Sequence, residues 1–137
     1  MSNDKQEYLL LFRGRDNWIK ELSPEELQQY VSKTTAWFNG MAEKGIVKGG
    51  QPLMPEGRVI SGKGGRTVSD GPFAESKETI GGYAIILAES LDEAVKLGQG
   101  CPPLAWGGSL EIRPFAEECP CMSYAQSVLA GKELAAV

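Results

Sequence analysis

The run Gly81-Gly82-Tyr83-Ala84-Ile85-Ile86-Leu87 is nearly all apolar after its two opening glycines. A nearly all-apolar run of this kind, opened by two glycines, is typical of a strand buried in the centre of a sheet. We therefore expect residues 83–87 to form a strand at the centre of a β-sheet.

A glycine-rich turn lies upstream of this strand, with β-branched residues on both of its sides. Arg58-Val59-Ile60-Ser61 precedes Gly62-Lys63-Gly64-Gly65, and Arg66-Thr67-Val68-Ser69 follows it. This arrangement predicts a β-hairpin. The turn has neither the glycine spacing nor the following helix of a phosphate-binding loop, so it does not indicate a nucleotide site.

A long amphipathic helix is predicted nearer the N-terminus. Ser23 is a favourable N-cap, Pro24 suits the first helical position, and the acidic residues that follow are stabilised by the positive end of the helix dipole. Apolar residues then recur at spacings of three and four from Leu27 to Met41. Gly45 supplies a typical end to the helix.

The remaining segments are shorter. Gly45–Leu53 and Ser109–Phe115 each predict a strand, and Ser90 with Glu93 three positions later predicts the start of a second helix that ends near Gly98. The apolar run Glu7–Arg13 fits either a buried strand or a fragment of a helix, because periodicity alone does not separate the two for so short a run.

A segment of ten residues upstream of the central strand has an order that is improbable by chance: Ser69-Asp70-Gly71-Pro72-Phe73-Ala74-Glu75-Ser76-Lys77-Glu78. They resemble the signature of the DGPF branch of the YCII-related proteins. Four other segments are similar to the same family, namely Tyr8–Phe12, Gly49–Leu53, Leu91–Ala94 and Ser109–Phe115. The resemblance covers roughly residues 7–115. It implies that Glu7–Arg13 is a strand and that the sheet pairs with a second copy in a dimeric α/β barrel.

The resulting order is strand, helix, strand, hairpin, strand, helix, strand. It predicts an α+β fold, a ferredoxin-like antiparallel sheet with two helices on one face and an inserted β-hairpin. The other sheet face then needs a cover, which a homodimer with two-fold symmetry would provide. We expect residues 1–115 to form this domain and residues 116–137 to be a C-terminal extension. The spacing of Tyr124, Val128, Leu129 and Leu134 predicts a short helix in that extension.

Composition excludes several classes of protein. The chain has 137 residues, the size of one domain, and a net charge of −4 with its Lys and Arg residues scattered between acids. A nucleic-acid partner is therefore not expected. The longest apolar runs stop well short of the ~18 residues of a membrane span, so no membrane partner is expected either. The first residues are polar and do not resemble a secretory signal, so we expect a cytoplasmic protein.

The chain contains no His, which removes His-based triads and His-containing metal sites. Its three Cys residues read as reduced thiols. Cys119-Pro120-Cys121 is either a soft-metal or redox pair or two thiols in a linker. We favour the linker, because a structural metal site normally needs four ligands and only Cys101 and carboxylates remain to complete one. We expect neither a metal nor a cofactor.

The loop after the hairpin holds the candidate catalytic carboxylates, Asp70 and Glu75. Asp70 is either an acid/base group at a cleft or a turn-forming residue that bonds its own backbone before Gly71-Pro72. Glu75 is either a proton acceptor or one charge of a solvated loop. Lys77 is either an anion-binding ammonium group or one charge of a solvated loop.

Four further residues are candidate ligand contacts. Arg13 and Arg113 lie on the first and last strands, where they could bind a carboxylate-bearing molecule, or could instead form salt bridges to Glu7 or Glu111. Family resemblance places Thr34 and Cys101 where better-known relatives have a proposed catalytic His and Asp. Because both of those residues are replaced here, the His–Asp mechanism of the relatives does not carry over to this chain.

Three functions remain open. The first is binding of a small organic molecule, and the second is an isomerase or lyase of the muconolactone isomerase or dehydrochlorinase kind, with Asp70 or Glu75 as the base. The third, suggested by the resemblance to DGPF proteins, is a regulatory or interaction module with a partner linked to a sigma factor.

Overall fold

The computed structural model describes residues 4–15, 17–71 and 79–131. Its main sheet has four strands, hydrogen-bonded in the order β2-β5-β1-β6, and every pair is antiparallel. These strands are β1 (Gln6–Gly14), β2 (Val47–Pro52), β5 (Thr79–Ala88) and β6 (Ser109–Pro114). This is the strand order of a ferredoxin-like sheet, and it confirms the α+β prediction. β5 lies between β2 and β1, as expected for the apolar run that it contains.

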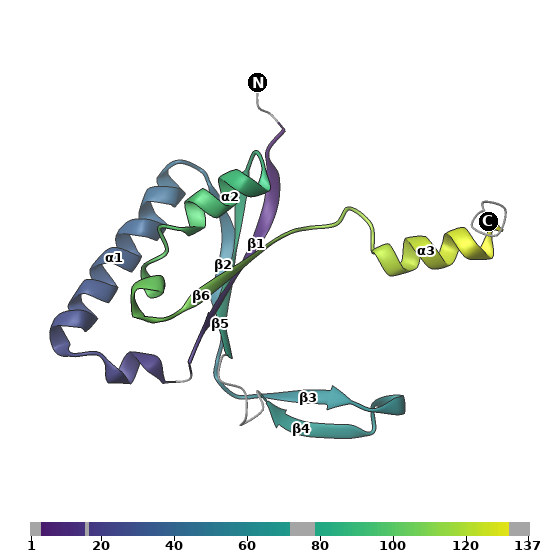
Figure 1. The fold of residues 1–137 in the computed structure, drawn as a ribbon, viewed down its shortest axis with the longest axis horizontal. Helices are drawn as coiled ribbons and strands as arrows, with labels where there is room; N and C mark the ends of the chain where they lie inside the picture. The colour runs from purple at the N-terminus through teal and green to yellow at the C-terminus, as the bar shows by residue number, and fades with distance from the viewer. Residues whose placement is uncertain (1–3, 16, 72–78, 132–137) are drawn as a thin grey trace.

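Two helices, α1 (Pro24–Glu43) and α2 (Leu91–Gly98), cover the same face of the sheet (Figure 1). Ser23 caps α1 in a full capping box with Glu26, and Ser90 accepts a hydrogen bond from the backbone N–H of Glu93 at the start of α2. α1 ends before Gly45, whose φ of 72° lies in the left-handed region that favours glycine. The predicted helix starts and ends are therefore confirmed.

The core lies between this helix layer and the sheet. Side chains alternate along β1 and β5, so Tyr8 and Leu10 point into the core together with Ala84, Ile86 and Ala88. Leu10 and Ile86 are fully buried. Met41 of α1 and Ala94 of α2 complete the buried cluster.

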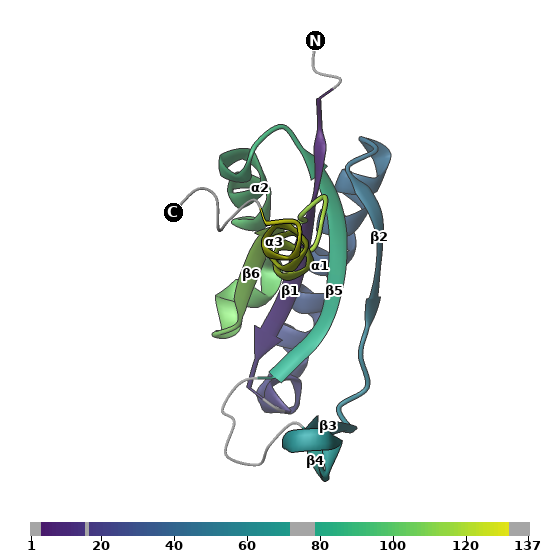
Figure 2. The same ribbon diagram turned by 90° about the vertical axis from the view of Figure 1, so that its right-hand side faces the viewer.

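We call the opposite side of the main sheet the open face, and no element of the described part of the chain packs flat on it (Figure 1, Figure 2). Strand alternation places Leu9 and Leu11 of β1 and Ile85 and Leu87 of β5 on it. All four are only half-buried in the single chain. An apolar face of this kind is unfavourable in water.

The inserted hairpin forms a separate two-stranded sheet of β3 (Gly57–Ser61) and β4 (Thr67–Gly71), with a short 3₁₀ turn η2 (Lys63–Gly65) at its tip. It projects on the side of the main sheet away from the helices (Figure 1). Ile60 and Val68 face each other across its strands and are 69% and 60% exposed.

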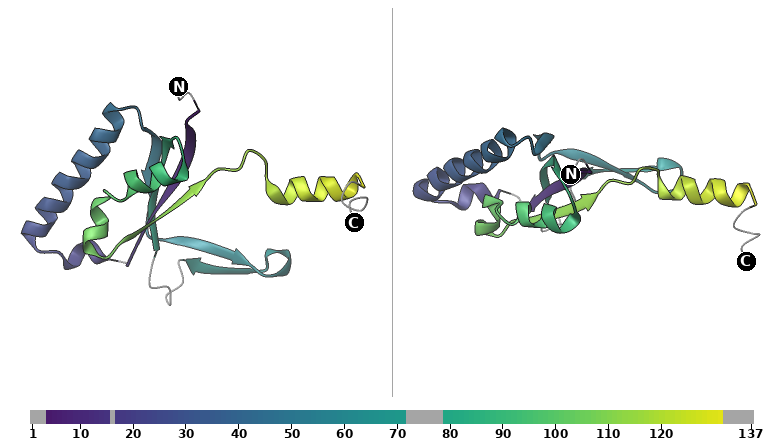
Figure 3. Two further views of the ribbon diagram at one scale, coloured as in Figure 1. Left: turned by 45° about the horizontal axis from the view of Figure 1, so that its top comes forward. Right: turned by 90° about the horizontal axis from the view of Figure 1, so that it is seen from above.

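Two 3₁₀ segments, η1 (Trp18–Glu21) and η3 (Pro102–Trp106), bracket one end of α1, and a last helix, α3 (Pro120–Leu129), follows β6. α3 stands clear of the body of the molecule (Figure 3). It lies where the sequence predicts a short helix, whereas the domain boundary at residue 115 stays a prediction. In the described part of the chain no helix is long and apolar enough to cross a membrane.

Candidate ligand cavity

A cavity of about 1060 Å³ opens between α1, the adjoining end of the main sheet and the segment that links β2 to the hairpin. We call it the α1 cavity. Cavities of this order hold drug-sized organic molecules. Its walls come from segments far apart in the chain: the end of β1, η1, α1, the β2 region, β5 and the start of η3.

An aromatic wall forms one side of the cavity. It comprises five side chains from β1, η1 and α1: Phe12, Trp18, Tyr30, Trp37 and Phe38. These rings meet mostly edge to face, with centroids 5.3 Å apart for Trp18 and Tyr30 and 4.9 Å for Trp37 and Phe38. Such aromatic pairs are favourable beyond their burial, so they give the cavity a defined apolar surface.

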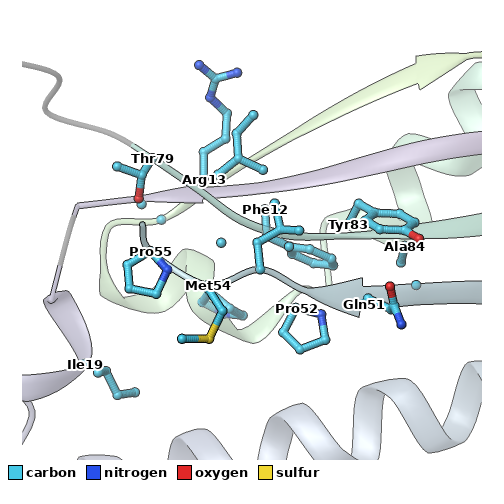
Figure 4. Close-up of a pocket in the computed structure, with 18 of the residues that line it drawn as sticks. Phe12, Arg13, Ile19, Gln51, Pro52, Met54, Pro55, Thr79, Tyr83 and Ala84 are labelled. Carbon is cyan, nitrogen blue, oxygen red and sulfur yellow. The ribbon is translucent and has the colours of Figure 1, made fainter. Parts of the chain in front are cut away.

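The opposing wall is the β2 region, seen in the close-up of Figure 4. Gln51, Pro52, Met54 and Pro55 lie there, across from Phe12. Met54 is 72% exposed, so this wall is thin and one of its sides faces solvent.

Close contact between β2 and β5 positions that wall. A Cβ atom at Gly50 would lie 2.5 Å from the carbonyl oxygen of Tyr83, and one at Gly82 would lie 2.9 Å from the carbonyl oxygen of Gln51. Only glycine fits where two backbones approach so closely. Gly50 and Gly82 therefore allow β2 to lie close to β5, and this determines the position of the cavity wall.

Thr34 presents a buried polar group without a partner in the described cavity. It lies on α1 among the lining residues, and its hydroxyl oxygen is buried without a hydrogen-bond partner in the described structure. A buried hydroxyl without a partner costs roughly 1–3 kcal/mol. This cost is recovered when a bound molecule supplies the missing partner.

Cys101 lines the same cavity, so the structure brings it together with Thr34. Cys101 is 4% exposed. Burial raises the pKa of its thiol to about 11, an effect only partly opposed by the backbone N–H of Leu104. The thiol is therefore neutral near pH 7, and the thiolate needed for a nucleophile is scarce.

Arginines at the cavity are paired with carboxylates. Arg13 donates a 2.6 Å hydrogen bond from its guanidinium to Glu111, and its side chain points away from Pro52 and Met54 in Figure 4. Arg15 pairs with Glu21, which holds the pKa of that exposed carboxyl below its ordinary value. The salt bridge to Glu111 is one of the two alternatives that the sequence left open for Arg13.

The other candidate residues lie elsewhere. Asp70 is on β4, with a side chain 91% exposed and 3.3 Å from Arg58, and it does not line the cavity. Arg113 is exposed on β6, opposite Leu9, and does not line it either. Glu75 and Lys77 lie outside the described residues.

Sequence analysis missed part of this cavity. Phe12 and Phe38 belong to periodic apolar patterns that indicate a core, and nothing in those patterns separates a cavity wall from a packed interior. In the described ranges no group of three or more His, Cys, Asp or Glu residues could hold a metal ion. Cys119 and Cys121 are exposed free thiols.

The buried thiol makes stability depend on pH in the alkaline range. Its pKa rises from an ordinary 9.0 to about 11 on folding, so the native state binds this proton more tightly than the unfolded state does. The stabilisation is complete below pH 9 and is lost as the pH rises through 11. We expect a loss of about 2–3 kcal/mol over that interval.

Cys101→Ala should abolish this component. Urea denaturation of both proteins at about pH 8 and about pH 11 would give the difference between their two losses. If Cys101→Ala lost as much unfolding free energy between these pH values as the wild type, the assignment to Cys101 would be contradicted. Cys121→Ala, at an exposed thiol, is the matched control.

Comparison with known proteins places this chain in a family. The model of the YCII-related domain matches residues 6–118. The chain belongs to the YCII-related family. Among curated proteins none matches it.

One similar solved structure is 5-chloro-2-hydroxyhydroquinone dehydrochlorinase (TftG) from Burkholderia phenoliruptrix AC1100, in complex with 2,5-dihydroxybenzoquinone. The likeness has a TM-score of 0.50 at 16% identity, and covers 82% of this YCII-related chain and 96% of that one. At this identity the likeness shows the fold alone.

Proposed function

We propose that this YCII-related protein binds a small, flat, largely apolar organic molecule in the α1 cavity. The buried hydroxyl of Thr34 carries the proposal, because it lines the cavity and has no partner among the described residues. The aromatic wall supports it, since Phe12, Trp37 and Phe38 offer surfaces on which a planar ring can pack.

The ligand class follows from the chemistry of the lining. Thr34 can donate one hydrogen bond and accept others, and the neutral thiol of Cys101 is a weak donor that lines the same cavity. A carbonyl or hydroxyl oxygen on a planar ring satisfies both groups without an ionic contact. A quinone or phenol fits this description, and the fold relative TftG was solved with 2,5-dihydroxybenzoquinone.

Thr34→Val tests the role of the hydroxyl while nearly preserving the volume of the side chain. We expect the affinity for 2,5-dihydroxybenzoquinone to fall about tenfold by calorimetric titration. The ligand-free variant should be more stable by about 1–2 kcal/mol in urea denaturation, because it no longer buries an unpaired hydroxyl.

Thr35→Val is the matched control, since Thr35 is exposed on the next position of α1 and does not line the cavity. Unchanged affinity in Thr34→Val would remove Thr34 from the binding site. Failure of a broad panel of quinones, phenols and organic acids to bind the wild-type protein would overturn the binding function itself.

We propose further that the protein is a homodimer closed through the open face and that it belongs to the DGPF branch of the family. The half-buried Leu9, Leu11, Ile85 and Leu87 support the dimer, since two such faces bury one another. Light scattering coupled to size-exclusion chromatography tests it, and a monomer at high concentration would contradict it.

An isomerase or lyase is the second candidate function, favoured by the fold shared with a dehydrochlorinase. It assigns proton abstraction to Asp70 or Glu75. Asp70 is exposed and faces Arg58, so a second element has to close over it before it meets a substrate in the α1 cavity. Turnover of a chlorinated hydroquinone that is unchanged by Asp70→Asn and Glu75→Gln would remove both assignments. The sigma-factor-linked partner stays a prediction.

A further inference from the structure

Helix α3 has little support from the described part of its own chain. It makes at most glancing contact with the other elements of the described structure, and Met122, Tyr124 and Leu129 are 57%, 65% and 86% exposed. A helix of ten residues is about 15 Å long and is marginal on its own in water. Its stability therefore calls for a surface that residues 4–15, 17–71 and 79–131 of the single chain do not provide.

The direction of α3 points to where that surface lies. Figure 2 views the sheet face-on, and α3 is seen nearly end-on in front of it, so the helix runs outward from the open face. Met122 and Leu129 are seven positions apart, which places them on one side of α3 as an apolar stripe.

The hairpin projects on the same side of the sheet, from a different level along the strands (Figure 1). Its exposed pair, Ile60 and Val68, is likewise uncovered by the described chain. Both projections thus stand on the open-face side of the sheet, at different levels along its strands. Packed sheets lie about 10 Å apart, so α3 is long enough to pass the edge of a second sheet.

We propose that α3 is an exchanged arm, which packs in the dimer against the β3–β4 hairpin of the partner protomer. A two-fold axis that lies between two facing sheets and runs across their strands exchanges the two ends of the strands. The hairpin of one protomer is thereby moved to the level of α3 of the other protomer. Because the symmetry is two-fold, the same contact forms at both ends of the dimer. The inference rests on the proposed homodimer.

This contact would link each protomer to the cavity of the other. Arg58 and Val59 of β3 and Gly71 of β4 line the α1 cavity at the base of the hairpin. An arm that holds the hairpin in place thereby fixes part of the cavity wall. The α3 helix lies beyond residue 118, where the match to the family ends, so it is a feature of this chain's own extension.

Crosslinking tests the contact directly. In a Cys119→Ser background Cys121 is the exposed thiol of the arm, because Cys101 is buried. Adding Ser61→Cys on β3 and a short bismaleimide should give a covalent dimer on a denaturing gel. The matched control pairs Cys121 with Gln28→Cys, an exposed position on α1, and should give no covalent dimer.

Substitution tests the apolar stripe independently. Met122→Asp should raise the dimer dissociation constant at least tenfold, since an apolar side chain of this size contributes that much when it is buried. Val31→Asp on α1 is the matched control, because Val31 is 56% and Met122 57% exposed in the single chain. We expect the dissociation constant of Val31→Asp to stay within about twofold of the wild-type value. This change is far smaller than the roughly tenfold change predicted for Met122→Asp.

The outcomes separate the arm from the dimer. The exchanged arm is supported if Ser61→Cys gives a covalent dimer, Gln28→Cys gives none, and Met122→Asp weakens association. A wild-type dimer without that crosslink, or with equal effects of Met122→Asp and Val31→Asp, overturns the arm and leaves the sheet-to-sheet dimer intact. A monomeric wild-type protein overturns both, while binding in the α1 cavity is measured separately.

Discussion

Replacing Gly50 by alanine is expected to destabilise the protein by about 2–4 kcal/mol and to abolish binding in the α1 cavity. The new Cβ atom would lie 2.5 Å from the carbonyl oxygen of Tyr83 and 2.8 Å from the Cα atom of Ala84. Both are backbone atoms of the neighbouring strand, so no side-chain rotation relieves the overlap. β2 must move away from β5, and the cavity wall at Gln51 and Pro52 moves with it.

Gly49→Ala is the matched control. Gly49 is the preceding residue of the same strand, and a Cβ atom there would meet nothing within 4 Å. Its stability should change by less than about 1 kcal/mol, with a gain expected from the smaller entropy of the unfolded chain. Urea denaturation and titration with 2,5-dihydroxybenzoquinone measure the two effects, and equal behaviour of the two variants would refute the role given to Gly50.

This glycine pair illustrates how far sequence reasoning reaches. Gly49-Gly50 reads as the end of an apolar strand, and this is wrong, because the strand Val47–Pro52 runs through both glycines. Which of the two glycines is required depends on the register of β2 against β5, a contact between residues more than thirty positions apart. Local signals carry no such information. Helix caps at Ser23 and Ser90 were predictable because their hydrogen bonds span only three residues.

The candidate site shows the same limit. Of the family-like signature, Gly71 lines the cavity and Asp70 does not, while most of the cavity wall comes from α1, η1 and the β2 region. Nothing in the local sequence of Thr34 shows that its hydroxyl lacks a partner, because that depends on what surrounds α1 in three dimensions. Family resemblance alone singles out Thr34 and Cys101 together, and both residues line the α1 cavity.

The second large effect is expected from Ile86→Ala, which should lower the free energy of unfolding by about 3–5 kcal/mol. Ile86 is fully buried at the centre of β5, where it packs with Leu10 of β1 in the core cluster. Truncation removes three carbon atoms from a closely packed interior and leaves a cavity that rigid β-strands cannot close. Urea denaturation at low protein concentration measures this loss in the separate protomer.

Ile85→Ala provides a control of the same residue type one position away. Ile85 is half-buried on the open face, so in the separate protomer its truncation should cost at most about 1 kcal/mol. In the dimer it lies at the proposed interface, and there the variant should weaken association instead. Equal losses of protomer stability for the two variants would mean that the open face is covered within a single chain. The proposed dimer would then lose its physical reason, since no apolar face would remain for a second copy to bury.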